Sequence, residues 1–412
     1  MTSGDGTIRY FSEFLPRISS LSLCIEIPPN EIRNIKCNRG NLKELFIFLK
    51  QAGTTAIKVE LVHEIKYYTD ERLMDLVHRS ISVSGGDSDN LRSTSLSLEV
   101  KDNSSSGTGK KDGVAVVKSQ TSDFLTSQHL KWSHDELNQM RLTFPVCKFQ
   151  CFQCDFQILD LNTTNKINCM PSEIWAEMME YWHCHKPNDD HGHNHEHDHD
   201  HENQKNTRYN TNLRPSKNSI IVGPYYILSN RQDVNSINID SNYVYCKNCG
   251  YDIGIVDEDS HLVKIWKYDL KLAYEDEIEG CDGDGGELEI EKFRPFLQIY
   301  EILLDSVSST AIRYYLIQDQ ANDGNFLNIW VFNFGVEIKL LPINFEFKDC
   351  LKIMYNKDLN FFKEKNNTFD TIIVPSKVFN DFEQILKDIT INLPINLRKM
   401  TDWSVSYLPS DV

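Results

Sequence analysis

Two Cys-x-x-Cys pairs are the residues in this sequence best suited to chemistry. Cys151 and Cys154 lie in "CFQC", and Cys246 and Cys249 lie in "CKNCG". A gap of two residues lets both sulfurs of one turn face a single ion at about 2.3 Å, and two such turns complete a tetrahedron. Gly250 suits a tight turn that needs a positive φ. The spacing favours structural zinc; four unligated thiols or a redox pair stay open as alternatives.

A second candidate site lies between the two pairs. Residues 170–187, "MPSEIWAEMMEYWHCHKP", have helical spacing with Ser172 as an N-cap, and Cys184 and His185 follow at the helix end. An adjacent imidazolium stabilises a thiolate, so Cys184 is the candidate for a reactive cysteine. Alternatively, Cys184 and His185 form an additional metal or partner site, or Cys184 is a buried thiol. Cys147, just before the first pair, is an alternative metal ligand.

The remaining cysteines and a histidine tract carry weaker signals. Alternating histidines from His191 to His201 either bind zinc or nickel loosely or belong to a tolerated loop expansion. Isolated cysteines in apolar or loop surroundings are predicted to be structural: Cys24, Cys37, Cys169, Cys281 and Cys350.

Composition narrows the classes of function. The net charge of −17 argues against direct binding of nucleic acid and favours protein partners with basic faces. The sequence has neither an apolar run long enough for a membrane span nor a secretory signal at its start. We therefore expect a cytoplasmic and nuclear location, where the eleven cysteines stay reduced and are available for metal. Phosphate-loop, dinucleotide-binding and hydrolase-elbow motifs are absent from the sequence.

The pattern of elements predicts an α+β fold in two parts. A β-rich region, residues 1–290, contains the cysteine pairs, and a C-terminal α+β domain spans 295–412. Three polar stretches are predicted to be insertions without structure, at about 80–113, 186–217 and 275–291. Strands are expected at 21–28 and 54–62, at 312–319, 328–334 and 336–343, and at 402–408; helices are expected at 41–53, 134–144, 296–310 and 376–390, the last with Ser376 as N-cap.

Several motifs occur in an order that resembles a known family. "CFQC", "MPSEIWAEMMEYWHCHKP", "GPYYILSN", "CKNCG" and "VKIWKYDL" follow one another as in the HECT-like proteins that bind ubiquitin-conjugating enzymes. The closing segment, residues 371–409, is similar to the last helix, Leu-Pro turn and final strand of that family. The resemblance spans roughly residues 145–412.

The resemblance implies a function, partners and site residues. It implies zinc ligands at Cys151, Cys154, Cys246 and Cys249, and it aligns Cys184 and His185 with the Cys-His pair of the family. Members are ubiquitin ligases that accept ubiquitin from a conjugating enzyme, and some bind the endonuclease of the mRNA cleavage and polyadenylation machinery. We therefore expect a protein that binds and stabilises or inhibits this endonuclease, or alternatively a ubiquitin ligase, so enzymatic activity stays open.

A thioester on Cys350 is disfavoured by the sequence. It is the cysteine of the C-terminal domain, in "FEFKDCLKIMY", and no neighbouring histidine is present to lower its pKa.

Overall fold

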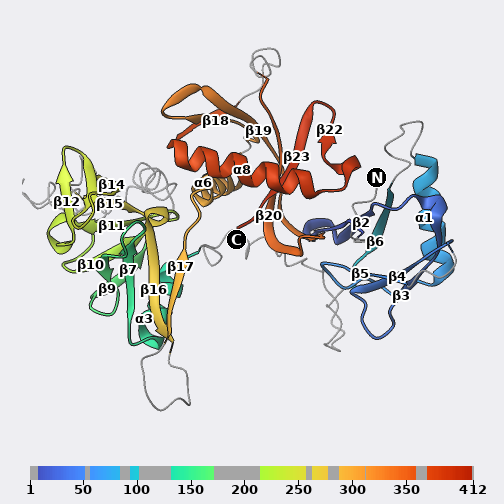
Figure 1. The fold of residues 1–412 in the computed structure, drawn as a ribbon, viewed down its shortest axis with the longest axis horizontal. Helices are drawn as coiled ribbons and strands as arrows, with labels where there is room; N and C mark the ends of the chain where they lie inside the picture. Colours follow the sequence, from blue (N-terminus) through green and yellow to red (C-terminus); the bar gives the residue numbers. More distant parts are fainter. Residues whose placement is uncertain are drawn as a thin grey trace, which may run out of the picture. The chain divides into compact units, whose positions relative to one another are not determined.

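The structure is a computed structural model of the 412-residue chain, and its described part is β-rich with few helices, in keeping with an α+β class. Two compact units make up the chain (Figure 1). Unit 1 combines residues 1–126 with 299–412, and unit 2 consists of residues 127–298. The structure describes residues 8–51, 56–83, 93–101, 131–170, 214–256, 262–276, 287–310, 312–358 and 369–410.

The structure divides the chain into units differently from the two parts expected from the sequence. The join at residues 298–299 lies near the predicted boundary, but the N-terminal residues belong with the C-terminal strands. Strand β1 (Tyr10–Leu15) pairs antiparallel with β19 (Asn322–Leu341), so two segments more than 300 residues apart share one sheet. Hydrophobic periodicity identifies a strand and its buried face, but it does not identify a distant partner strand.

Unit 1 is built on a nine-stranded sheet in the order β22-β23-β20-β19-β1-β2-β6, in which β18 also pairs with β19 and β21 pairs with β18. Helix α8 (Ser376–Asn392) packs on this sheet, where Ser406 donates a hydrogen bond to the carbonyl of Leu386 at 2.9 Å (Figure 1). The other elements are β2 (Ser20–Ile25), β6 (Thr94–Glu99), α6 (Leu297–Ser309), β18 (Tyr314–Asp319), β20 (Phe345–Asn356), β21 (Asp370–Val374), β22 (Lys399–Met400) and β23 (Trp403–Leu408).

Two local expectations in unit 1 are corrected. The two strands expected at 328–334 and 336–343 form one twenty-residue strand, β19, with register shifts against β20. Ser376 is not the N-cap of α8, because Pro375 holds that position and the Ser376 hydroxyl donates to Asp319 at 2.6 Å.

A smaller three-stranded sheet also belongs to unit 1. It consists of β3 (Ile32–Cys37), β4 (Glu44–Leu49) and β5 (Ile57–Glu60), and helix α1 (Asp70–Val83) shares its apolar core. The helix predicted at 41–53 is wrong. Leu45 and Ile47 are buried while their neighbours are half-buried, and this period of two is that of a strand paired on both sides.

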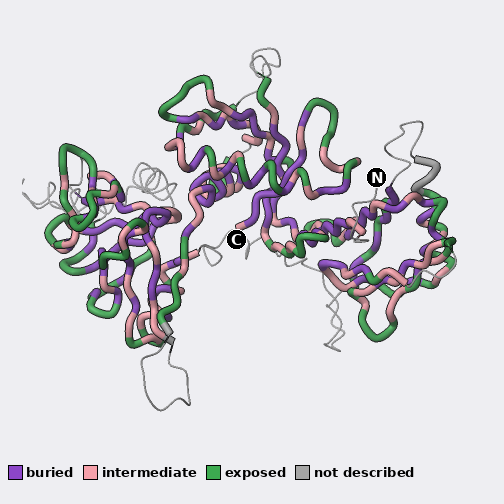
Figure 2. Tube along the Cα trace, viewed as in Figure 1, coloured by how far each residue is buried: buried purple, intermediate pink, exposed green. Residues whose placement is uncertain are grey.

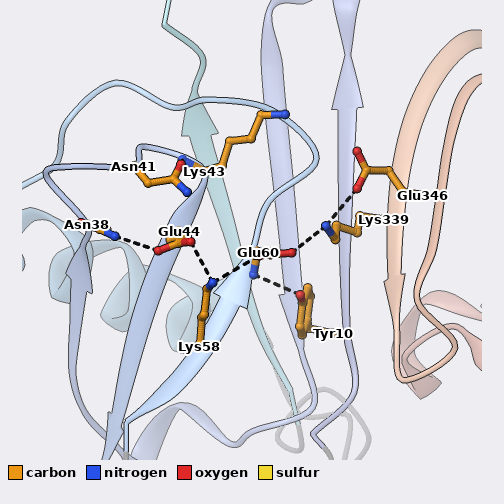
Figure 3. A network of polar contacts seen from close by, with 9 residues as sticks. All are labelled: Tyr10, Asn38, Asn41, Lys43, Glu44, Lys58, Glu60, Lys339 and Glu346. Atoms are coloured by element: carbon orange, nitrogen blue, oxygen red, sulfur yellow. Dashed lines mark hydrogen bonds and ion pairs between the residues drawn. The ribbon is translucent and has the colours of Figure 1, made fainter. Parts of the chain in front are cut away.

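Charged side chains connect the small sheet to the large one (Figure 3). Lys339 of β19 lies 2.9 Å from Glu60 of β5 and 2.9 Å from Glu346 of β20. Lys58 extends the network, at 3.3 Å from Glu60 and 2.8 Å from Glu44. Because the Lys339 side chain is only 10% exposed, its two contacts fix the strands more firmly than surface ion pairs do.

Strands form within two of the predicted insertions. Residues 94–99 pair with β2, with Leu96 and Leu98 buried, and β17 (Glu287–Lys292) pairs with β16 (Leu270–Asp276). The polar composition of both segments led to the expectation of no structure. A strand needs only every second residue to be apolar, because its side chains alternate between two faces. Within the insertion expected at 80–113, the structure describes only residues 80–83 and 93–101. Most of the insertion expected at 186–217 lies outside the described residues, as does the helix expected after residue 170.

Unit 2 contains a seven-stranded sheet, in the order β12-β13-β14-β15-β11-β10-β9, and a four-stranded sheet, β17-β16-β7-β8. Helix α3 (His134–Thr143) begins at a capping box between Ser133 and Glu136. Most buried residues of unit 2 lie on its strands, and most exposed residues lie in the turns between them (Figure 2). The strands are β7 (Cys147–Cys151), β8 (Gln157–Asp160), β9 (Lys166–Cys169), β10 (Ser219–Val222), β11 (Tyr226–Asn230), β12 (Ile237–Asp240), β13 (Tyr243–Cys246), β14 (Asp252–Val256), β15 (Leu262–Trp266), β16 (Leu270–Asp276) and β17 (Glu287–Lys292).

Among the described residues, no helix is long and apolar enough to cross a membrane. The two units also contain short 3₁₀ helices. These short helices are η1 (Pro16–Ile18), η2 (Pro29–Glu31), η5 (Arg231–Asp233), η6 (Lys267–Asp269) and η7 (Ile395–Leu397).

Gly254 allows strands β14 and β15 to lie close together. A Cβ atom at this position would lie 2.1 Å from the backbone oxygen of Lys264. We expect Gly254→Ala to lower the free energy of unfolding by about 3 kcal/mol, since a backbone carbonyl cannot move without moving its strand. Denaturant titration measures this change. Gly40→Ala is the control, because the nearest atom to its new methyl group is 3.6 Å away. Equal losses in the two variants would contradict the steric argument.

Candidate metal centre

The two cysteine pairs follow strands of different sheets. Cys151 is the last residue of β7 in the four-stranded sheet, and Cys246 is the last residue of β13 in the seven-stranded sheet. In each case the chain turns immediately after the strand and presents a second cysteine, Cys154 or Cys249. The candidate site therefore joins the two sheets of unit 2.

The two turns have the same backbone hydrogen bonds. The amide of Cys151 donates to the carbonyl of Phe156 at 2.8 Å, and the amide of Asp155 donates back to Cys151 at 3.1 Å. In the second turn Cys246 donates to Tyr251 at 2.8 Å, and Gly250 donates to Cys246 at 2.9 Å.

Both turns also place a left-handed residue directly after the second cysteine. Asp155 has φ of 57° and Gly250 has φ of 71°, so the conformation expected of Gly250 is confirmed. The equivalent conformation at Asp155 was not foreseen, because aspartate is a less obvious signal than glycine.

The four sulfurs form one cluster. All lie within 4.8 Å of one another, with 3.8 Å between Cys151 and Cys249 and 3.7 Å between Cys154 and Cys246. Metal–sulfur bonds of about 2.3 Å at tetrahedral angles require sulfur separations of about 3.8 Å. The structure thus brings together the four predicted cysteines at distances that suit one metal ion.

Burial and charge at the cluster favour a bound cation. Burial raises the pKa of Cys151 to about 12, and partial desolvation together with the neighbouring sulfurs of Cys154 and Cys246 raises that of the exposed Cys249. Burial opposes ionisation of Cys154 as well, but hydrogen bonds from the Asn248 side chain and the Phe156 backbone lower its pKa to about 7. Without a cation, only one of these three thiols ionises readily near neutral pH. A divalent cation would stabilise all four thiolates.

Asp269 contacts both cysteine turns. It belongs to η6, the short helix between β15 and β16, and is 3% exposed. Its carbonyl accepts from the Phe152 amide at 3.0 Å, and its carboxylate accepts from the Tyr251 hydroxyl at 2.9 Å. Sequence reasoning did not single out this residue, although it lies in the motif "VKIWKYDL". Asp269 therefore positions the two turns relative to each other.

A buried lysine anchors the same short helix. Lys267 has no exposed surface, and its ammonium donates to three backbone carbonyls, those of Lys131 at 3.1 Å, Trp132 at 3.0 Å and Pro224 at 3.1 Å. Trp132 is itself fully buried, and its indole donates to Glu291 at 3.0 Å. These contacts hold the segment before α3 and the loop after β10 against η6.

The other candidate residues either lie outside the described residues or are not members of the cluster. Cys184 and His185 are outside the described residues, as are Cys281 and the histidine tract. Cys147 is buried on β7 and is not a member of the four-cysteine cluster, and burial raises its pKa to about 12. Cys350 is fully buried on β20, and burial raises its pKa well above the ordinary value, which fits a structural role.

Residues 13–405 match the sequence profile of the family of HECT-like ubiquitin-conjugating enzyme (E2)-binding proteins. The chain belongs to this family. The match includes segments of both units and both cysteine pairs, and the resemblance seen in the sequence motifs is confirmed. This HECT-like protein is also similar to a Saccharomyces cerevisiae protein described only as uncharacterized, with 24% identity over 407 residues, which covers 97% of this chain and 99% of that protein. No solved structure matches the chain.

Proposed function

We propose that this HECT-like protein binds a ubiquitin-conjugating enzyme and takes part in ubiquitin transfer, with unit 2 held together by structural zinc. The family match over residues 13–405 is the observation that carries the proposal. A ubiquitin-ligase-like role as a binding protein follows from that membership, and transfer through a thioester of this chain is the finer alternative.

Zinc is the ion that the donor set suits best. Four thiolates at tetrahedral spacing are typical of Zn²⁺ or of iron–sulfur chemistry, and zinc sites with four protein ligands leave no position for substrate. A metal here would therefore be structural rather than catalytic. Reduced thiols also require a reducing compartment, so the proposal includes location in the cytoplasm and nucleus.

Transfer through this chain would require an accessible thiol, and Cys184 is the proposed carrier. We expect Cys184→Ser to bind the conjugating enzyme normally and to lose transfer, whereas Cys350→Ser keeps both because the Cys350 thiol is fully buried. A panel of ubiquitin-charged conjugating enzymes measures binding by co-purification and transfer by thioester discharge. Normal ubiquitin transfer by both variants would mean that neither thiol carries ubiquitin and that this protein acts as a scaffold. Failure of every conjugating enzyme to bind the natural chain would overturn the proposed function.

The endonuclease of pre-mRNA 3′-end cleavage is a second proposed partner. The net charge of −17 supports it, because an enzyme that cuts RNA needs a basic channel that an acidic protein could cover. Purification of the natural chain at native salt, followed by mass spectrometry, distinguishes the partners. Recovery of a conjugating enzyme without the endonuclease would remove this second partner from the proposal.

A further inference from the structure

Two arginines of unit 1 lie against one aromatic ring. The guanidinium of Arg17 is 3.7 Å from the ring centre of Phe334, and that of Arg313 is 5.2 Å from the same centre. Arg17 belongs to η1 between β1 and β2, Arg313 precedes β18, and Phe334 lies on β19. A turn near the start of the chain and the paired strands β18 and β19 thus bring two positive charges to one place.

Neither arginine has an ion pair or side-chain hydrogen bond within the described residues. The chain nevertheless has 60 acidic residues against 43 lysines and arginines. Phe48 provides a comparison within the same unit, since it also has two cations near its ring, Arg33 at 5.9 Å and Lys36 at 5.7 Å. There, however, Lys36 has a carboxylate partner, Asp70, at 3.7 Å.

The fold holds the two arginines in place despite their repulsion. Arg17 follows Pro16 in a short helix closed by the amide of Ser19, which donates to the carbonyl of Pro16 at 3.2 Å. The carbonyl of Arg313 accepts from the amide of Val331 at 2.9 Å, which ties its backbone to β19. Burial and the charge of Arg313 lower the pKa of Arg17, so its positive charge is not fully compensated. An anion placed between the two guanidinium groups would relieve this repulsion.

We propose that Arg17 and Arg313 bind the phosphate group of a phosphorylated serine or threonine on a protein partner. A phosphate monoester carries a charge of about −1.5 to −2 at neutral pH, which matches two guanidinium groups, whereas a carboxylate matches one. Nucleic acid is disfavoured, because each of its phosphates carries one charge and the net charge of −17 repels a polyanion.

A recess begins at the residues that follow Arg17 in the chain. Residues 18–20 form part of the wall of this recess of about 400 Å³, and Leu76 and Leu98 line it together with basic and acidic side chains, those of Arg72, Arg79, Asp75 and Glu99. Such a recess can hold the residues that flank a phosphorylated side chain. The site lies in unit 1, separate from the four cysteines, so the proposal does not depend on the metal or on binding of a conjugating enzyme.

The test uses the full chain and an immobilised peptide library with phosphoserine at its centre and degenerate flanking positions. We expect saturable binding to this library and weaker binding to libraries with serine or glutamate at the centre. Arg17→Gln and Arg313→Gln should each weaken binding by at least about tenfold, because each removes charge-assisted hydrogen bonds to phosphate. Arg33→Gln, which removes an exposed arginine above Phe48, should bind as the natural chain does. Thermal unfolding of each variant confirms that it is folded.

Several outcomes would overturn the proposal. No saturable binding to the phosphoserine library is one, and equal binding to the glutamate library is another. Equal weakening by Arg33→Gln would attribute the binding to general charge rather than to this site. Competition by inorganic phosphate at the affinity of the peptides would show that the site takes a free ion instead of a protein partner.

Discussion

Cys246→Ala is expected to abolish metal binding and to unfold unit 2. Cys246 is fully buried at the end of β13, and its sulfur lies 3.7 Å from that of Cys154 on the other sheet. With one ligand removed, three sulfurs cannot close the tetrahedron, and the two sheets lose their shared link. Structural zinc contributes about 10–16 kcal/mol of apparent binding energy in small zinc domains, which is comparable to the whole stability of a typical domain.

Metal content and unfolding can be measured together. Elemental analysis of a variant that lacks residues 190–202 should give one zinc per chain, without adventitious metal on the histidines. Cys147→Ala is the matched control, because this thiol is equally buried on β7 but lies outside the cluster. It should retain the metal. The assignment of the four cysteines as metal ligands would be refuted if the natural chain contained no metal. It would also be refuted if Cys246→Ala kept the normal ratio of metal to protein. Acid should release the metal as the thiolates take up protons.

Lys267→Met is expected to lower the free energy of unfolding by about 3–5 kcal/mol, because it leaves three backbone carbonyls without their donor. The methionine fills similar volume, so the loss reports the missing hydrogen bonds rather than a cavity. Urea titration of the metal-loaded protein measures the change.

The control for this lysine is Lys271→Met. The Lys271 side chain is 15% exposed and forms one ion pair at 2.6 Å with Asp155, which is 59% exposed, so its loss should cost about 1 kcal/mol, well below the loss at Lys267. Similar losses in the two variants would mean that the three carbonyls are satisfied without Lys267.

Sequence reasoning located the cysteine cluster because its information is local. A Cys-x-x-Cys turn is specified by six neighbouring residues, and two such turns predict one metal site. The same was true of α6 and α8, whose apolar residues recur with helical spacing. It failed at β4, where Leu45, Phe46, Ile47 and Phe48 make a continuous apolar run that does not distinguish a helix from a strand.

Other features could not be foreseen because they depend on distant contacts. Asp269 and Lys267 look like ordinary charged residues in the sequence, and only the fold places them among the cysteine turns and the three carbonyls. The pairing of β1 with β19 likewise depends on strands separated by the whole of unit 2.

The pairing of β1 with β19 has a consequence for the order of folding on the ribosome. At about 5–20 residues per second, β1 emerges tens of seconds before β19 is synthesised, and it must wait without its partner. Unit 2 is continuous in sequence, from residue 127 to 298, so it can fold and take up metal while the rest of the chain is still being made. During that interval the unpaired edge of β1 is open to wrong pairing, and molecular chaperones would be needed most before residue 341 is released.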